Sequence, residues 1–245
     1  MMRSPVGIRR IVLVVLDGFR PETIDHCSLL NFRRLASGGA RTIRAEPALP
    51  SVDIPALFRD VTGRVTSELG VAGTRFVGRD CQSILRSAQR TLSMQRRGLI
   101  LMHWPDAERA GNDNGCASDQ YHDSARSLDK SLGILAAHLE VPRDAGTLLI
   151  AVSDHGRVAT SDQPIRGFLD RREFLVFVGG AVAPAPLPKT VSILDVAPTI
   201  LWALGITGSD PAGMPLRRIF RSVREPSFVG GSQVRSIIGD SVKAG

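Results

Sequence analysis

Three carboxylates and one imidazole in this sequence each follow a short apolar or extended run. They are Asp17, Asp53, Asp154 and His155. If those runs are parallel strands of one sheet, all four side chains lie at its carboxyl edge, where ligands bind in open α/β folds. Carboxylate oxygens with one imidazole nitrogen suit a divalent cation such as Zn²⁺, Mn²⁺ or Mg²⁺. The pattern therefore predicts one metal site built from these four residues.

Apolar runs alternate with longer amphipathic segments, which is typical of strands connected by helices. We expect strands at 11–16, 40–46, 98–104, 146–153 and 173–180, and helices at 28–36, 80–96, 118–139 and 192–205. This order predicts an α/β fold with a mostly parallel central sheet and helices on both faces. No repeat or linker interrupts it. We therefore expect a single domain over 1–245, with about 225–245 as a loose tail.

Composition is that of a soluble globular chain with one large core: 245 residues, 43% hydrophobic and 22% charged. The longest apolar run, 11-IVLVVL-16, is too short to span a bilayer, and no signal-peptide cleavage site follows it. The three cysteines are scattered without a C-x-x-C pair, which suits a reducing compartment. We expect a cytoplasmic protein that has no membrane anchor.

The net charge of +7 comes mainly from arginines spread along the chain. A positive field raises the encounter rate of anionic small molecules, so such a molecule is the expected ligand. Nucleic acid is not expected, because the chain lacks a Lys/Arg stripe with interleaved aromatics and has only one Tyr and two Trp. A solvated basic surface is the simpler interpretation of the remaining charge. The oligomeric state is left open.

Five motifs, in one order along the chain, resemble the alkaline phosphatase superfamily in its type I phosphodiesterase and nucleotide pyrophosphatase branch. They are 14-VVLDGFRPETID-25, the turn at 50–56 with Thr62-Gly63 behind it, 104-WPDAERAGNDNG-115, 153-SDHG-156 and 194-LDVAPTILWALGITGSDPAGMPL-216. A lone S-D-H-G would be unspecific, but five motifs in sequence are specific. The resemblance implies an alkaline phosphatase-like core, in which 64–97 is a trimmed version of the insertions of relatives.

The resemblance also implies two divalent metals, usually zinc. The first would be held by the four residues named above, all of which are competent ligands. At the second, Glu108 and Asn112 stand where an Asp and a His are expected, and no histidine follows His155. Asparagine is a poor ligand for zinc, although Glu108 is able to help hold a hard cation with waters. We expect one metal per chain, zinc before manganese or magnesium, and a second site that is empty or weak.

Asp53 stands at the position where this family carries a Thr or Ser nucleophile. A carboxylate there keeps a metal ligand, adds negative charge and repels an incoming phosphate. It either attacks phosphorus itself, as aspartyl nucleophiles do elsewhere, or serves as ligand or base beside a metal-activated water. The substitution argues against the family's usual mechanism, and we favour the ligand with activated water.

Three functions fit these residues. The first is a metal-dependent hydrolase, phosphatase- or phosphodiesterase-like, acting on an anionic phosphate ester or a related small metabolite. The second is a catalytically silent member that binds a ligand or a partner protein, and the third is a one-metal enzyme with redirected, non-hydrolytic chemistry. The intact first site favours an enzyme, because unused ligands tend to drift.

The remaining polar residues near the motifs carry less information. Arg20 follows the metal-binding Asp and either meets an anionic substrate or forms a surface ion pair. His26 is the histidine to watch as a recruited ligand. His103 lies inside an expected strand and is interpreted as a core or edge histidine.

Overall fold

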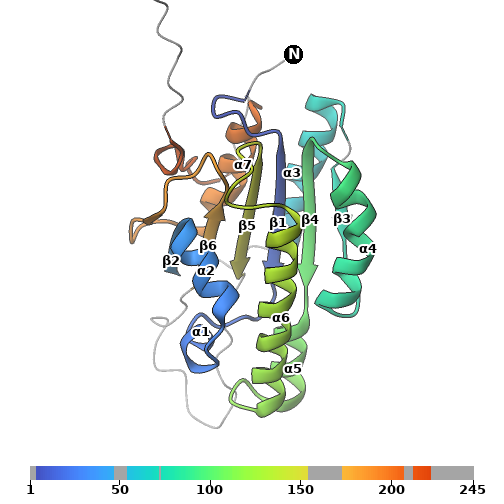
Figure 1. The fold of residues 1–245 in the computed structure, drawn as a ribbon, viewed down its shortest axis with the longest axis vertical. Coiled ribbons are helices and arrows are strands. Elements are labelled where there is room, and N and C mark those ends of the chain that lie inside the picture. The colour runs from blue at the N-terminus through green and yellow to red at the C-terminus, as the bar shows by residue number, and fades with distance from the viewer. Residues whose placement is uncertain (1–3, 47–53, 72, 154–172, 207–211, 222–245) are drawn as a thin grey trace, which may run out of the picture.

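The computed structural model describes residues 4–46, 54–71, 73–153, 173–206 and 212–221. A seven-stranded sheet forms its centre, in the order β3-β4-β1-β5-β6-β2-β7 (Figure 1). The strands are β1 (Arg10–Leu16), β2 (Ala40–Ala45), β3 (Thr74–Phe76), β4 (Gly98–Trp104), β5 (Thr147–Ser153), β6 (Glu173–Val178) and β7 (Ala185–Pro186). Every strand expected from the apolar runs is present, and β3 and β7 are additional.

All strands except β6 run in the same direction. β1 pairs in parallel with β4 and β5, β3 with β4, and β7 with β2. β6 is antiparallel to both β5 and β2, so β2 returns to the direction of β1. The mostly parallel sheet is confirmed, and the carboxyl ends of its parallel strands meet at one edge.

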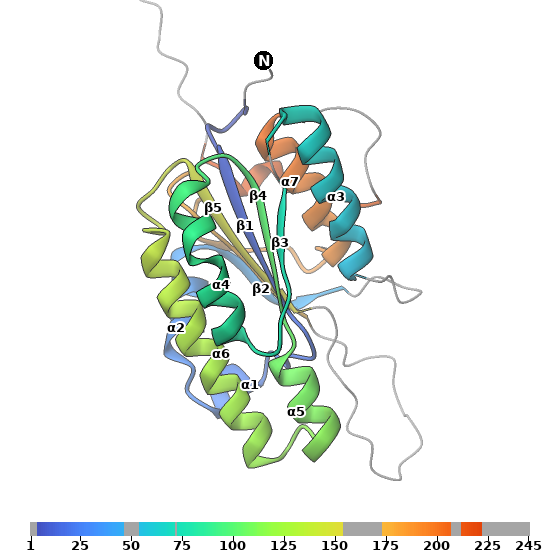
Figure 2. The ribbon, with the colours of Figure 1, turned by 90° about the vertical axis from the view of Figure 1, so that its right-hand side faces the viewer.

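Helices cover both faces of the sheet. They are α1 (Thr23–His26), α2 (Leu30–Gly38), α3 (Ile54–Leu69), α4 (Cys81–Met94), α5 (Asp106–Asn114), α6 (Asp119–His138) and α7 (Val196–Leu204), with 3-10 turns at Ile193–Asp195 and Arg217–Ile219. Figure 2 shows α3 and α7 on one face and α2, α4 and α6 on the other. The α5 helix lies beyond the carboxyl edge, toward which β1, β4 and β5 point (Figure 1).

Local signals fix where several helices begin and end. The Asp80 side chain accepts a hydrogen bond from the Ser83 N–H at 2.7 Å and so caps α4. Ser118 caps α6 in the same way through the Tyr121 N–H. Gly205 follows α7 with a φ of 81°, a left-handed conformation that glycine adopts without strain. The expected helix at 192–205 is therefore present as a 3-10 turn followed by α7.

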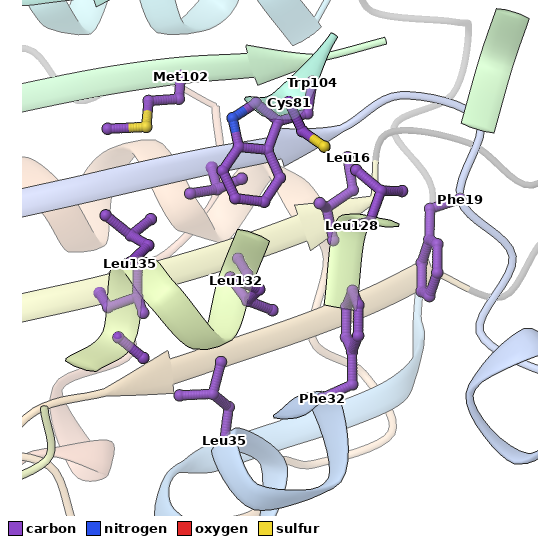
Figure 3. Packing of buried hydrophobic residues seen from close by; sticks show 14 of the residues in the cluster. Leu16, Phe19, Phe32, Leu35, Cys81, Met102, Trp104, Leu128, Leu132 and Leu135 are labelled. Carbon is purple, nitrogen blue, oxygen red and sulfur yellow. The ribbon is translucent and has the colours of Figure 1, made fainter. Parts of the chain in front are cut away.

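The central strand separates two apolar clusters. Along β1, Ile11, Leu13 and Val15 pack with α3 and α7, and Val12, Val14 and Leu16 pack with α2, α4 and α6. Part of the second cluster is drawn in Figure 3, where Leu132 and Leu135 of α6 lie in the same core as Met102 and Trp104 of β4. Burial on both faces explains why β1 reads as a continuous apolar run rather than an alternating one.

Some expectations lie outside the described residues. These are the tail at about 225–245 and three of the four expected metal ligands, Asp53, Asp154 and His155. Within the parts of the chain that the structure describes, no helix is both long enough and apolar enough to cross a membrane.

The burial of Leu132 in α6 predicts a large loss of stability on truncation. Leu132 is fully buried, whereas Ile134 of the same helix is 50% exposed. We expect Leu132→Ala to lower the free energy of unfolding by about 2–5 kcal/mol, because it removes buried methyl groups and leaves a cavity. Ile134→Ala is the control and should change it by less than about 0.5 kcal/mol. Urea unfolding followed by circular dichroism measures both, and equal losses would contradict the packing described.

Candidate active site

Asp17 is held at the carboxyl edge by backbone hydrogen bonds on both sides. Its N–H donates to the Trp104 carbonyl at 3.0 Å, and its own carbonyl accepts from the Glu108 N–H at 2.9 Å. Gly18 follows with a φ of 67°, and a Cβ added there would lie 2.6 Å from the Cα of Glu108. Only glycine fits this turn, because both the conformation and the space exclude a side chain. The Asp-Gly pair of the first motif thus brings the backbone of Asp17 against α5.

His103 lies beside Asp17 on the neighbouring strand. In the parallel pairing of β1 with β4, Val15 is opposite His103. Alternate residues share a face of a strand, so Asp17 continues the face of Val15, and His103 continues the face of Leu101, which packs in the same cluster. His103 Nε2 lies 3.2 Å from Asp17 Oδ2, and the two side chains are 20% and 18% exposed. The contact brings an imidazole and a carboxylate together at the site edge.

The ring nitrogen of His103 is not satisfied by a hydrogen bond. Among the described residues, Nε2 is buried and has no hydrogen-bond partner. The Oδ2 of Asp17 is close enough, but it does not lie in the direction in which the ring N–H would point. The contact is therefore a close approach of two polar atoms and not an aligned hydrogen bond. The sequence interpretation of His103 as a core or edge histidine missed this contact.

The first turn of α5 carries two acids that do different work. The carboxylate of Asp106 accepts the Cys81 N–H at 2.8 Å, at the start of α4, and burial raises the pKa of Asp106. Glu108 instead packs against Gly18, as its backbone contact with Asp17 requires. Asp106 thus fixes α4 to α5, and Glu108 is the acid of this segment that lies next to the Asp17 turn.

Asn112 lies one helical turn beyond Glu108 and is exposed. Its amide Nδ2 donates to Glu108 Oε1 at 3.0 Å. The two residues expected at a weak second metal site are therefore adjacent. The hydrogen bond occupies a lone pair of Glu108 that a cation would otherwise use.

The buried phenol of Tyr121, from α6, fixes the chain that follows Asp17. Its hydroxyl donates to the Gly18 carbonyl and accepts the Arg20 N–H, both at 3.0 Å. Burial raises the pKa of Tyr121 to about 12, so the phenol stays neutral and keeps its proton for Gly18. The guanidinium of Arg20 pairs with Glu22, with Nε 2.6 Å from Oε1. Of the two roles expected for Arg20, the ion pair is the one that the described residues contain.

Two further residues bear on the site. The His26 ring contacts His122 of α6, with centroids 4.6 Å apart, instead of the Asp17 carboxylate that a recruited ligand would join. Glu173 begins β6 with an exposure of 1%, at the same edge of the sheet. Its neighbours Leu175 and Phe177 place it on the face of Asp17 by the same alternation. No sequence motif pointed to Glu173.

The other three expected ligands, Asp53, Asp154 and His155, lie outside the described residues, but the elements next to them are described. β5 ends at Ser153, which is paired with Leu16 of β1, and Asp154 and His155 come next in the sequence. α3 begins at Ile54, directly after Asp53, and covers the face on which Asp17 and His103 lie. Within the described residues alone, no three acidic, histidine or cysteine side chains form a metal-binding group.

This arrangement agrees with a comparison with known families. The family model of type I phosphodiesterases and nucleotide pyrophosphatases matches residues 11–90 and 81–194. The chain belongs to this family. No curated protein sequence matches it significantly.

Solved structures show the same fold for this phosphodiesterase-family chain at low sequence identity. Murine ectonucleotide pyrophosphatase/phosphodiesterase 5 superposes with a TM-score of 0.69 at 11% identity, over 87% of this chain and 100% of that one. An inactive variant of the murine protein, in complex with AMP, gives 0.70 with the same identity and coverage. The lipoteichoic acid synthase LtaP of Listeria monocytogenes gives 0.64 at 11% identity, over 89% of this chain and 78% of that one. The expected alkaline phosphatase-like fold is confirmed.

The tight turn at Gly18 predicts a steric penalty that a control can isolate. Gly7 has a similar φ of 74°, but nothing lies within 4 Å of an added Cβ. Gly7→Ala should therefore lower the free energy of unfolding by about 1–2 kcal/mol, because alanine is strained in the left-handed conformation. Gly18→Ala adds the clash with the Glu108 backbone, for a total of about 2–5 kcal/mol. Chemical denaturation compares the two, and equal costs would contradict the close approach of α5.

Proposed function

We propose that this phosphodiesterase-family protein is a metal-dependent hydrolase of a phosphate ester, phosphodiester or related anionic metabolite. One divalent cation is held by Asp17, Asp53, Asp154 and His155. The observation that supports a cation is the pair formed by the Asp17 carboxylate and the buried, unbonded Nε2 of His103. A carboxylate oxygen and an imidazole nitrogen at this distance are both donor atoms that a divalent cation accepts. The residues present therefore fit a divalent metal.

When bound, the cation supplies charge neutralisation at a phosphoryl oxygen and lowers the pKa of an attacking water. The residues of the chain position the reactants around it. Asp17 is fixed by its two backbone hydrogen bonds and by the Gly18 turn. The 16-residue helix α3 begins directly after Asp53, and the positive end of a helix dipole favours an anionic group there. We propose that Asp53 is a ligand or base beside the water rather than the nucleophile.

The second site of the family is proposed to be empty or to hold a weak hard cation. The Asn112 amide already engages the Glu108 carboxylate. An amide that donates to its neighbour leaves a weaker donor set than an Asp and a His would offer. We propose zinc for the retained site, with manganese and magnesium as alternatives.

The substrate belongs to the same proposal. AMP is bound by the murine relative, and we propose that this chain takes an anionic phosphate-bearing small molecule, with no nucleic acid or membrane partner. Its proposed location is the cytoplasm, a reducing compartment that suits the free thiols of Cys27, Cys81 and Cys116.

Metal content tests the ligand set. Elemental analysis of the purified chain, loaded with Zn²⁺, Mn²⁺ or Mg²⁺, should give one metal per chain. Asp154→Ala should abolish tight binding because it removes a charged ligand, and Asp113→Ala, at an exposed position of α5, should not change it. Unchanged stoichiometry in Asp154→Ala would refute the assignment. Two ordered zinc ions in a crystal would refute the weak second site, and no metal under any condition would favour a ligand- or partner-binding member.

Two variants separate the roles of Asp53. Asp53→Asn keeps the shape, removes the charge and should weaken the metal site. If Asp53 only serves beside an activated water, Asp53→Thr should retain or raise hydrolysis of an aryl phosphodiester. The gain stays limited, because a second metal that stabilises the developing charge is missing. A fall of about 10²–10⁴ in rate would instead show that Asp53 acts as the base or the nucleophile. An acyl-phosphate trapped on Asp53, detected by mass spectrometry, would identify it as the nucleophile.

A further inference from the structure

The Nε2 atom of His103 is a feature of the site that the four proposed ligands leave unexplained. It is buried, lies on the site face of β4 and has no hydrogen bond among the described residues. A buried polar atom without a partner costs about 1–3 kcal/mol, and a cation bound at Nε2 would offset that cost. We propose that His103 is an additional ligand of the cation held by Asp17. This inference rests on the proposed metal-dependent function.

The distance between the two donor atoms fits a shared cation. In tetrahedral zinc sites, bonds of about 2.0–2.1 Å to nitrogen and oxygen place two ligand atoms about 3.3 Å apart. His103 Nε2 and Asp17 Oδ2 are 3.2 Å apart. A direct hydrogen bond at this distance would need the ring N–H to point at the oxygen, and it does not. The distance between Nε2 and Oδ2 and the lack of an aligned hydrogen bond between them both agree with two ligands that face the same ion.

Both donors are carried by rigid elements. Asp17 directly continues β1 and His103 belongs to β4, and these two strands are paired over their whole length from Arg10↔Gly98 to Leu16↔Trp104. The Asp17 N–H donates to the carbonyl of Trp104, the residue after His103. The hydrogen-bond ladder between β1 and β4 therefore continues up to both ligands. Ligands on paired strands keep their spacing better than ligands on loops. The site is therefore preorganised on this side, before a cation binds.

An additional imidazole changes which cation the site prefers. Carboxylate oxygens alone suit Mg²⁺ or Mn²⁺, whereas each imidazole shifts preference toward Zn²⁺ and Co²⁺. The segment of Glu108 and Asn112 offers no imidazole of its own. His103 of β4, three residues before Asp106 at the start of α5, supplies one from the strand instead. An imidazole from His103 therefore favours zinc over magnesium or manganese at the site of Asp17.

The test counts imidazoles bound to a metal. The full chain, stripped with a chelator, is reloaded with Co²⁺ or Zn²⁺ and studied by X-ray absorption, visible absorption of Co²⁺ and competition with a chromophoric chelator. The variants are His103→Ala and His103→Gln, and the matched control is His138→Ala, at an exposed position near the end of α6. Circular dichroism verifies that each variant is folded.

We expect the His103 variants to show one fewer imidazole per metal than the wild type, a changed Co²⁺ spectrum and an affinity lowered by more than about 100-fold. His138→Ala should match the wild type. An affinity lowered by about 10–100-fold with an unchanged Co²⁺ spectrum and imidazole count would mean that His103 only orients Asp17, and would overturn the proposal. Unchanged affinity would overturn it as well.

The wild type separates this inference from the proposed function. A wild-type chain that binds one metal through a single imidazole refutes His103 as a ligand and leaves the metal-dependent function standing, even if neither His103 variant folds. A wild-type chain that binds neither Co²⁺ nor Zn²⁺ refutes both.

Discussion

The parallel pairing of β1 with both β4 and β5 is the constraint on which the rest of the structure depends. All residues of β1 are buried, so its register against each neighbour is set by side chains on two faces as well as by the backbone ladder. A shift of one residue would exchange the two apolar clusters and turn Asp17 to the other face. The correct register ends β1, β4 and β5 at one level, and this common end is where polar side chains collect.

The turn after β1 converts that register into a site. Gly18 allows the first turn of α5 to approach the backbone of Asp17, and the buried phenol of Tyr121 holds the following residues from the other side of the sheet. Asp106 fixes α5 to the start of α4 through Cys81. Packing and site geometry are thus coupled, because the contacts that close the core around α4, α5 and α6 also position the carboxylate of Asp17.

The sequence predicted those parts whose signals are local. Continuous apolar runs predicted β1, β4 and β5. The expected helices at 80–96, 118–139 and 192–205 begin at Asp80, begin at Ser118 and end at Gly205, where caps are observed. The contact of His103 with Asp17 was missed because it depends on which strand lies next to β1 and in which register, and the two residues are far apart in the chain. His103 alternates with Leu99 and Leu101, so the sequence could have shown which face of the strand it shares with them. It could not have shown that Asp17 lies beside it. The different roles of Asp106 and Glu108 were likewise not visible in the sequence, because each role depends on a contact with a residue that is distant in the chain.

The two borders of the sheet have a consequence for behaviour at high concentration. β3 has three residues, and β7 has two, of which Pro186 offers no backbone N–H. A strand from another molecule needs a long row of unpaired amides and carbonyls to add to a sheet, and such short borders provide few. The apolar strands β1, β5 and β6, which could act as templates for fibrous assembly, are enclosed between others. The chain therefore carries built-in protection against aggregation through its most apolar segments.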